Sequence, residues 1–306
     1  TDKWGYGDQL EATCFPTASA LAATWDTALI QKVGEKLGYE AQARDVNILL
    51  GPGTNIKRSL LGGRNFEYFS EDPILSGEMA AAYINGVQSQ GVGTSLKHYV
   101  ANNQETNRMR RNSSLDERTL HEIYLRPFEI AVKKAQPWTI MACYNRVRGE
   151  YGTQSPYLLN EVLKERWGYK GIVISDWEAV IDRVKALKAG MHVQMPGYEA
   201  SYTDKQIVQA VKSGDLDEAV LDEIVKETLQ IILKADAHEK ENVERQEEEH
   251  HAFARKVAAQ AITLLKNKND VLPLTGDKYK EIAIIGEFAT NPRYQGNGSS
   301  EIKPTQ

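Results

Sequence analysis

The chain has 306 residues, of which 41% are hydrophobic and 26% are charged, close to the average for soluble globular proteins. Its formal charge of −5 excludes a basic field for nucleic acid, and no apolar run approaches the roughly 20 residues that span a bilayer. Only Cys14 and Cys143 are cysteines, which excludes a disulfide framework, and no Cys/His cluster has the spacing of a metal site.

The first residues, TDKWGYGDQL, contain no basic start followed by an apolar stretch, so no signal peptide is visible. This slightly favours a cytoplasmic location. Because the chain does not start with Met, a secreted location stays open in case a leader was removed.

From about residue 46, short apolar runs alternate with longer amphipathic segments. The apolar runs predict buried strands at residues 46–51, 93–100, 138–144, 171–176 and 191–195. Helices are expected at residues 78–90, from 114 to about 131, from 155 to about 163, and from 203 onward. Strict alternation of this kind implies a parallel sheet covered by helices, either a barrel or an open doubly wound sheet.

Local signals mark three of these helix starts. Residues 114–117 (SLDE) and 203–206 (TDKQ) follow the capping-box pattern, and Ser155 before Pro156 combines a hydroxyl cap with a first-turn proline. Apolar side chains then recur at helical spacing, at Leu120, Ile123, Tyr124, Phe128 and Ala131 after the first signal, and at Leu158, Leu159, Val162 and Leu163 after Ser155. Both helices are therefore expected to bury one face.

The composition changes after about residue 235. Residues 238–251 are crowded with charge, and a helix over 252–265 and a strand over 282–286 are expected to follow. The adjacent His250 and His251 lie in this charged stretch and are expected to be solvated rather than bound to metal. This part of the chain is interpreted as a connection followed by the first piece of a second domain.

Three of the predicted strands finish their apolar run in side chains that carry chemistry. They are Lys97-His98, Tyr144-Asn145 and Asp176-Trp177. The carboxyl ends of parallel strands face one common rim, where the active sites of such folds are built. Arg64, in the loop after the first predicted strand, would reach the same rim.

Each residue also has a simpler interpretation. Asp176 alone would be expected to cap the next helix, Lys97 and His98 could form a surface pair, and Tyr144 could be a core residue. Their recurrence at equivalent strand ends favours a functional site.

Several long segments resemble glycoside hydrolase family 3, and among its members the β-glucosidase branch. They are residues 64–73 (RNFEYFSEDP), 97–104 (KHYVANNQ), 141–145 (MACYN), 162–177 (VLKERWGYKGIVISDW) and 292–300 (PRYQGNGSS). The resemblance runs from residues 14–16 (CFP) to the end of the chain.

The resemblance implies a role for each residue at the rim. Asp176 matches the catalytic nucleophile, and Trp177 matches a wall between the sugar site and the leaving-group site. The other matched residues contact the sugar or the nucleophile: Arg64, Lys97 and His98 hold sugar hydroxyls, Tyr144 lies near the nucleophile, and Met141 lines the sugar pocket. Arg108 lies in a motif of the same branch and is expected to form a loop ion pair.

The chemistry agrees with these roles. A retaining glycosidase needs one ionised carboxylate as nucleophile and a second carboxyl roughly 5–5.5 Å away as acid. Lys97 and Arg64 would favour the ionised form of Asp176 if they lie within several ångströms. No step requires a metal or another cofactor.

The resemblance also implies the fold and the domains. It predicts a (β/α)8-type, TIM-like barrel over residues 1–234, a linker and connecting helix over 235–280, and the first piece of an α/β sandwich domain over 281–306. The family's Asp-Gly-Pro segment is missing, so the barrel is expected to lack its first strand. The acid/base Glu is expected in the second domain, outside this chain.

One further departure lies at residues 192–197 (HVQMPG), where the family usually has Asp-Leu-Glu-Met-Pro-Gly. His192 and Gln194 replace acidic residues, which weakens any prediction of charge behind the pocket.

The predicted function is release of terminal β-linked glucose through a covalent intermediate on Asp176. The alternatives are a β-xylosidase or broad aryl-β-glycosidase, and a non-catalytic sugar-binding barrel. A β-N-acetylglucosaminidase is disfavoured because residues 97–101 (KHYVA) depart from the Lys-His-Phe-Pro-Gly of that branch. The expected partners are a β-glucoside or oligosaccharide and a second domain of the same enzyme, with a homo-oligomer left open and with no nucleic acid or membrane.

Overall fold

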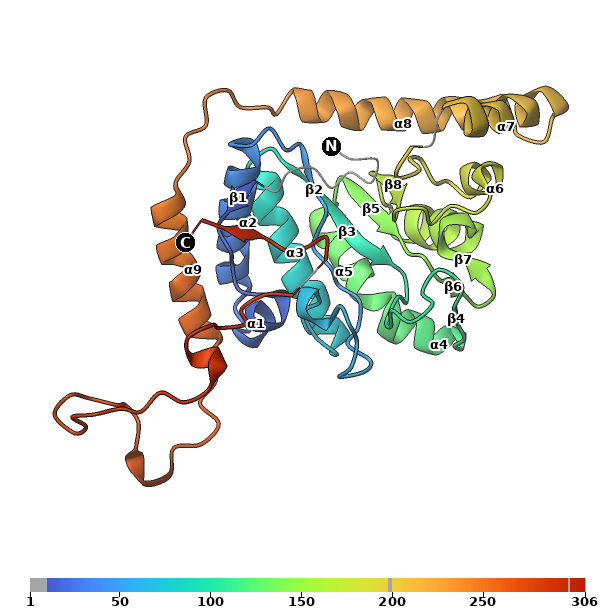
Figure 1. The fold of residues 1–306 in the computed structure, drawn as a ribbon. Helices are drawn as coiled ribbons and strands as arrows, with labels where there is room; N and C mark the ends of the chain where they lie inside the picture. The colour runs from blue at the N-terminus through green and yellow to red at the C-terminus, as the bar shows by residue number, and fades with distance from the viewer. Residues whose placement is uncertain (1–9, 198–199, 297, 306) are drawn as a thin grey trace.

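A parallel sheet forms the centre of the fold. The computed structural model describes residues 10–197, 200–296 and 298–305. The sheet has the order β2-β3-β5-β8, so each strand lies beside the next one along the chain (Figure 1). Its strands are β2 (Ile48–Leu49), β3 (Gly93–Tyr99), β5 (Thr139–Ala142) and β8 (Ile172–Ser175), all paired in parallel. These four strands confirm the first four predicted runs. The run at 191–195 forms no strand of its own, but it lies beside β8 through the bridge between Ile174 and Val193 and through backbone hydrogen bonds such as that from the Ser175 amide to the Val193 carbonyl at 2.9 Å.

Three long helices cover one face of the sheet. In chain order they are α2 (Thr27–Gln42), α3 (Pro73–Ser89) and α5 (Arg126–Ala135), and α3 packs against both of the others. Glycines bring α2 and α3 together: a side chain at Gly34 would place its Cβ 2.5 Å from the Tyr83 carbonyl oxygen. Close backbone contact of this kind excludes any larger residue.

Shorter elements surround this core. The strands β4 (Asn112–Ser113), β6 (Arg146–Val147) and β7 (Glu150–Tyr151) form a small sheet, and β1 (Glu11–Ala12) pairs in parallel with β9 (Lys303–Pro304). The remaining helical segments are α1 (Ala18–Ala23), Asn65–Glu67, α4 (Glu117–Thr119), Leu120–Tyr124, Gly152–Gln154, Tyr157–Arg166, α6 (Arg183–Lys188), α7 (Ala200–Ser213), α8 (Glu218–Asp236), α9 (Glu247–Ala261), Lys268–Asp270 and Glu287–Ala289.

Side-chain caps explain why two helices begin elsewhere than predicted. Helix α3 begins at Pro73, not at residue 78, because the Asp72 carboxylate accepts from the amides of Ile74 and Leu75 at 2.8 Å each. The predicted capping box at 114–117 is also wrong. Helix α4 begins at Glu117, and its cap is Asp116, whose carboxylate accepts from the Thr119 amide at 2.8 Å.

Buried faces were predicted with mixed success. After Ser155, the face formed by Leu158, Leu159, Val162 and Leu163 is buried as expected. Before α5, a π-helical turn at Leu120–Tyr124 changes the rotation between successive side chains. Leu120 and Phe128 are therefore buried, while Ile123 is 37% exposed. Helix α7 begins at Ala200, ahead of the predicted start at residue 203.

The C-terminal region departs most from the prediction. Helix α9 (Glu247–Ala261) begins and ends earlier than the predicted 252–265. No strand forms at 282–286 within the described residues, and Ile282, Ile284 and Ile285 are exposed there. A strand needs a neighbour to pair with, and no described segment lies beside this one. None of the helices in the described parts is both long enough and apolar enough to cross a membrane.

His250 is buried, which contradicts the expectation that it is solvated. Figure 1 shows α9 running beside α1 and α2. His250 joins α9 to α2 through Glu40, and Lys36 of α2 also pairs with Glu249 of α9. Its Nδ1 lies 2.8 Å from Oε1 of Glu40, whose Oε2 accepts from the Thr13 amide at 3.1 Å. A buried carboxylate needs such partners, and Glu40 finds them on two segments distant in the chain, at Thr13 and on α9.

Candidate active site

Asp176 directly follows β8 and does not cap a helix. Its Oδ1 accepts from the Trp177 amide at 2.8 Å, and the next helix, α6, begins only at Arg183 and is capped by Asp182. The Asp176 side chain is 9% exposed, and its Oδ2 is buried without a hydrogen bond from the described residues. The simpler interpretation of Asp176 as a helix cap is therefore wrong.

Lys97 and His98 lie near the carboxyl end of β3 and are buried, so they are not a surface pair. Nε2 of His98 lies 3.5 Å from Oδ2 of Asp176. Asn55 fixes the backbone of His98 from both sides, because its Oδ1 accepts from the His98 amide at 2.7 Å and its Nδ2 donates to the His98 carbonyl at 2.9 Å.

Glu67 joins the two cations of the site. Its Oε1 accepts from Nε of Arg64 at 2.5 Å, and its Oε2 lies 3.3 Å from Nζ of Lys97. Glu67 lies in the segment 64–73 that resembles the family, but the sequence predicted no role for it. The available signal was its position three residues after Arg64, since the short helix at Asn65–Glu67 turns both side chains to one side.

Arg108 lies over Tyr144, another predicted site residue. The Arg108 guanidinium carbon is 4.3 Å from the centre of the Tyr144 ring, and its Nη1 donates to Oε2 of Glu105 at 2.8 Å. The predicted loop ion pair is thus present, and the same side chain also packs on the phenol.

Met141 and Trp177 belong to one apolar cluster that extends along β5 and β8. Met141 is 2% exposed and is buried with Trp138, Ile172 and Ile174, while Trp177 packs against this cluster and is partly buried. The Asp176 carboxylate thus lies beside His98 and interacts electrostatically with Arg64, Lys97 and Tyr144, while Met141 and Trp177 meet in the apolar cluster.

Burial dominates the electrostatics of the site. It raises the pKa of Asp176 above the ordinary range, although the Trp177 amide, Arg64, Tyr144 and Lys97 all favour the ionised form. The expectation that Lys97 and Arg64 favour that form is correct in sign, yet burial outweighs them. Burial likewise lowers the pKa of Lys97.

Burial sets the charge of two further groups. It lowers the pKa of His98 well below its usual value, and nearby Arg64 and Lys97 lower it further, so the imidazole is neutral. Burial alone would raise the pKa of Glu67, but Lys97 and Arg64 together hold it below the ordinary value. Glu67 is therefore the permanent counter-charge of the two cations.

A cavity of about 220 Å³ reaches one side of this site. Glu67 and Lys97 line it together with residues from 14–21, 50–53 and 295–302, and Asp176 lies outside its lining.

Cys143, next to Tyr144, is fully buried, and burial raises the pKa of its thiol to about 12. A neutral thiol of this kind is no nucleophile.

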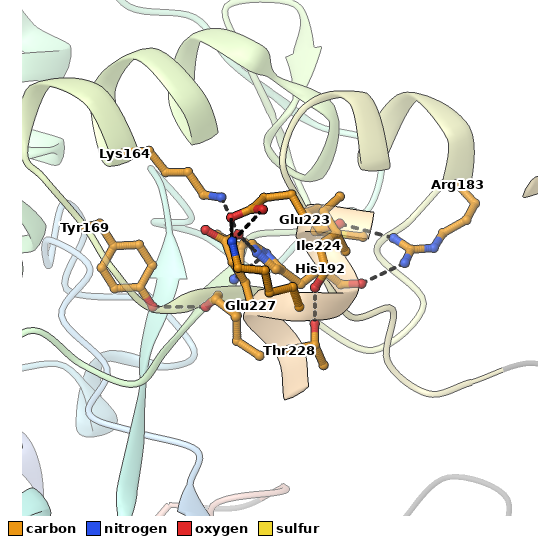
Figure 2. A network of polar contacts seen from close by, with 12 residues as sticks. Lys164, Tyr169, Arg183, His192, Glu223, Ile224, Glu227 and Thr228 are labelled. Carbon is orange, nitrogen blue, oxygen red and sulfur yellow. Dashed lines mark hydrogen bonds and ion pairs between the residues drawn. The ribbon is translucent and has the colours of Figure 1, made fainter. Parts of the chain in front are cut away.

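A second polar network lies behind β8, around His192 (Figure 2). Nδ1 of His192 accepts from the Val173 amide at 3.1 Å, and Nε2 lies 2.6 Å from Oε2 of Glu227 on α8. Lys164 donates to the same oxygen at 2.7 Å, and Arg183 donates to the His192 carbonyl at 2.7 Å. The carboxylate of this network is thus Glu227 on α8, whereas position 192, which is acidic in the family motif, is a histidine here.

Two family models match this chain. Glycosyl hydrolase family 3 N terminal domain matches residues 2–231, and Glycosyl hydrolase family 3 C-terminal domain matches residues 262–306.

The chain is also similar to proteins of known name and structure. It is 55% identical over 299 residues to thermostable beta-glucosidase B of Acetivibrio thermocellus, covering 98% of this chain and 39% of that protein. It is 47% identical over 307 residues to an exo-alpha-(1->6)-L-arabinopyranosidase of Bifidobacterium longum, covering 98% of this chain and 40% of that protein. The crystal structure of a Bifidobacterium adolescentis GH3 beta-glucosidase superposes with a TM-score of 0.93 at 46% identity, over 98% of this chain and 44% of that one.

These relatives are longer than the chain, which spans less than half of their length. The N-terminal family model covers most of the 306 residues, and the identity to the relatives extends over nearly all of them. The chain belongs to glycoside hydrolase family 3.

Proposed function

We propose that this chain carries the nucleophile and part of the sugar site of a retaining glycosidase that releases terminal β-linked glucose. The observation that carries the proposal is the Asp176 carboxylate. One of its oxygens is held by the Trp177 amide, and the other is buried beside His98 without a hydrogen bond from the described residues. This second oxygen, Oδ2, is available to attack a carbon atom.

In the proposed reaction, Oδ2 of Asp176 attacks the anomeric carbon, and the bond from that carbon to the leaving oxygen breaks. A carboxylic acid gives its proton to the leaving oxygen. Water then attacks the same carbon, its proton passes to the carboxylate of that acid, and glucose leaves with Asp176 ionised again.

The other side chains of the site would bind and orient the sugar. Arg64, Lys97 and His98 carry N–H groups that can donate to its hydroxyls, and Trp177 offers an apolar ring to its C–H face. Tyr144 would donate to the Asp176 carboxylate and favour its ionised form. Met141 would contribute to the apolar floor.

We propose that the acid/base Glu lies outside these 306 residues, in a second domain. Longer relatives and the C-terminal family model support this division. We further propose a TIM-like barrel over 1–234, a connection over 235–280 that includes α9, and a piece of the second domain over 281–306. The parallel order β2-β3-β5-β8 supports the barrel.

A pentose at the cleavage site is the second candidate. The observation that favours it is the 47% identity to an arabinopyranosidase. A panel of nitrophenyl glycosides with glucose, xylose and arabinopyranose would rank the sugars by kcat/KM in the full-length gene product. Highest kcat/KM with a pentoside would replace the proposed glucosidase activity.

Incubation with a 2-fluoro glucoside tests the central claim. This inhibitor should leave a covalent sugar on Asp176, detected by mass spectrometry of the digested full-length gene product. The Asp176→Asn variant should stay unlabelled, and Asp215→Asn, which alters an exposed carboxylate paired with Lys188, should label like the wild type. Sugar binding without a covalent product would instead support a non-catalytic binding barrel.

A further inference from the structure

We propose that Tyr68 is a positioning residue for His98. In this inference the Tyr68 hydroxyl donates to Nδ1 of His98 and holds the imidazole in the tautomer whose proton lies on Nε2, facing Asp176. The inference deepens the proposed function, and its kinetic consequences depend on that function.

Tyr68, His98 and Asp176 form a continuous line of polar atoms. The Tyr68 oxygen lies 3.1 Å from Nδ1 of His98, and Nε2 on the other side of the ring lies 3.5 Å from Oδ2 of Asp176. The two rings meet edge to face, with centres 6.1 Å apart and planes at 78°. Tyr68 is 2% exposed and His98 is 1% exposed, so neither polar group can turn to bulk water instead.

The direction of the hydrogen bond follows from counting protons. His98 is neutral because burial and the neighbouring Arg64 and Lys97 keep its pKa well below the usual value. A neutral imidazole carries one proton, on Nδ1 or on Nε2.

A proton on Nδ1 would leave the bare lone pair of Nε2 facing the Asp176 carboxylate, and two groups that only accept repel each other. A proton on Nε2 avoids this repulsion and leaves Nδ1 as an acceptor. Tyr68 must then donate, and it keeps its proton because burial raises the pKa of its phenol.

The surrounding backbone holds both rings in place. Gly53 makes a bridge to Tyr68, and a Cβ built at Gly53 would lie 2.8 Å from Cδ1 of the Tyr68 ring. The ring therefore occupies the space that a side chain at position 53 would need. On the other side, Asn55 fixes the backbone of His98. Tyr68 thus has little freedom to leave Nδ1.

The functional consequence is a defined N–H donor beside the nucleophile. With its proton on Nε2, His98 can donate to the ionised carboxylate of Asp176 or to a sugar hydroxyl placed between them. With its proton on Nδ1 it could do neither. Tyr68 itself need not touch substrate, so its effect would pass through His98.

The experiment compares three forms of the full-length gene product: wild type, Tyr68→Phe and Tyr169→Phe. Tyr169 is a matched control, because its buried hydroxyl also donates one hydrogen bond, to the Ile172 carbonyl at 3.0 Å, and lies outside the site. ¹⁵N NMR of the His98 ring, with histidine labelled selectively and His98→Gln used for assignment, reports which nitrogen carries the proton.

In the unliganded wild type, Nε2 should be protonated and Nδ1 unprotonated. Tyr68→Phe should shift the Nδ1 resonance and lower kcat/KM about 3- to 10-fold, the range expected when one buried hydrogen bond is lost. Tyr169→Phe should change neither.

A protonated Nδ1 in the wild type would overturn the proposal. This NMR measurement uses the wild type alone, so it does not depend on whether Tyr68→Phe folds. Equal kcat/KM in the two phenylalanine variants would overturn it as well. If the wild type hydrolyses no glycoside while Nε2 still carries the proton, the proposed function fails and the tautomer assignment stands.

Discussion

Nε2 of His98 lies 3.5 Å from Oδ2 of Asp176, although β5 separates their two strands in the sheet. The contact forms because both side chains leave the carboxyl ends of their strands on the same side. It places a neutral donor beside a buried carboxylate whose other oxygen is already held by the Trp177 amide.

Asp176→Asn should remove activity and stabilise the fold. Loss of a covalent nucleophile typically lowers kcat by a factor of about 10⁴ or more. Burial raises the pKa of Asp176, so its contribution to stability is present at low pH and is lost as pH rises through the pKa of the folded state. An amide carries no charge, and the melting temperature at pH 7 should rise by about 1–4 °C. Calorimetry checks this, and a lower melting temperature than that of Asp215→Asn would contradict it.

The midpoint of the acid limb of the kcat/KM profile should lie at a pH above the ordinary pKa of an aspartate, which is near 3.9. Attack requires the ionised form of Asp176, and burial raises the pKa of this group. Arg64 favours the ionised form, so Arg64→Gln should move the acid limb of kcat/KM to higher pH. The measurement is kcat/KM of the full-length gene product from pH 3 to 8. An unchanged or lower midpoint in Arg64→Gln would show that the limb belongs to another group.

Glu67→Gln should weaken sugar binding more than it changes the fold. The amide can still accept from Arg64, but it removes the carboxylate that forms the ion pair with Lys97. Because hydrogen bonds to charged groups contribute about 1.5–3 kcal/mol, kcat/KM should fall about 10- to 100-fold. Glu78→Gln, which alters an exposed pair with Lys134, serves as the control and should keep wild-type kinetics. Similar kinetics in both variants would remove Glu67 from the site.

Glu227→Gln should reveal a pH-dependent contribution to stability from the network in Figure 2. The hydrogen bond with His192, together with Lys164, lowers the pKa of Glu227 to about 2. Its contribution is therefore complete above the ordinary value near 4.3 and is lost as pH falls through about 2. At pH 7 the variant should lose about 0.5–1 kcal/mol, a modest amount because Glu227 is partly exposed.

Urea unfolding of both forms between pH 7 and pH 2 measures this difference. When the free energy of unfolding is plotted against pH, the wild-type and variant curves should run parallel down to about pH 5 and converge below it. Glu223→Gln is the control, since Glu223 lies on the same helix and its ion pair with Lys226 is exposed. A constant gap down to pH 2 would mean that the Glu227 carboxylate is not the cause.

Local patterns in the sequence determined the alternation of strands and helices and the residues at the strand ends. Runs of six to eight residues predicted β2, β3, β5 and β8, and the carboxyl-terminal parts of the last three runs contain Lys97, His98, Tyr144 and Asp176. This worked because a buried strand must be apolar along its length, and because parallel strands direct their carboxyl ends to one rim. The same reasoning failed at 282–286, where an apolar run has no neighbour among the described residues to pair with.

The tertiary structure alone decided which groups meet and how burial changes their charge. Glu67, Tyr68 and Asn55 gained their roles from contacts with β3, and Glu227 and His250 gained theirs from helices distant in the chain. The sign of the pKa shift of Asp176 was equally out of reach, because it is a balance between the cost of removing a charge from water and the attraction of nearby cations. Both terms depend on distances between residues far apart in sequence, and packing sets those distances.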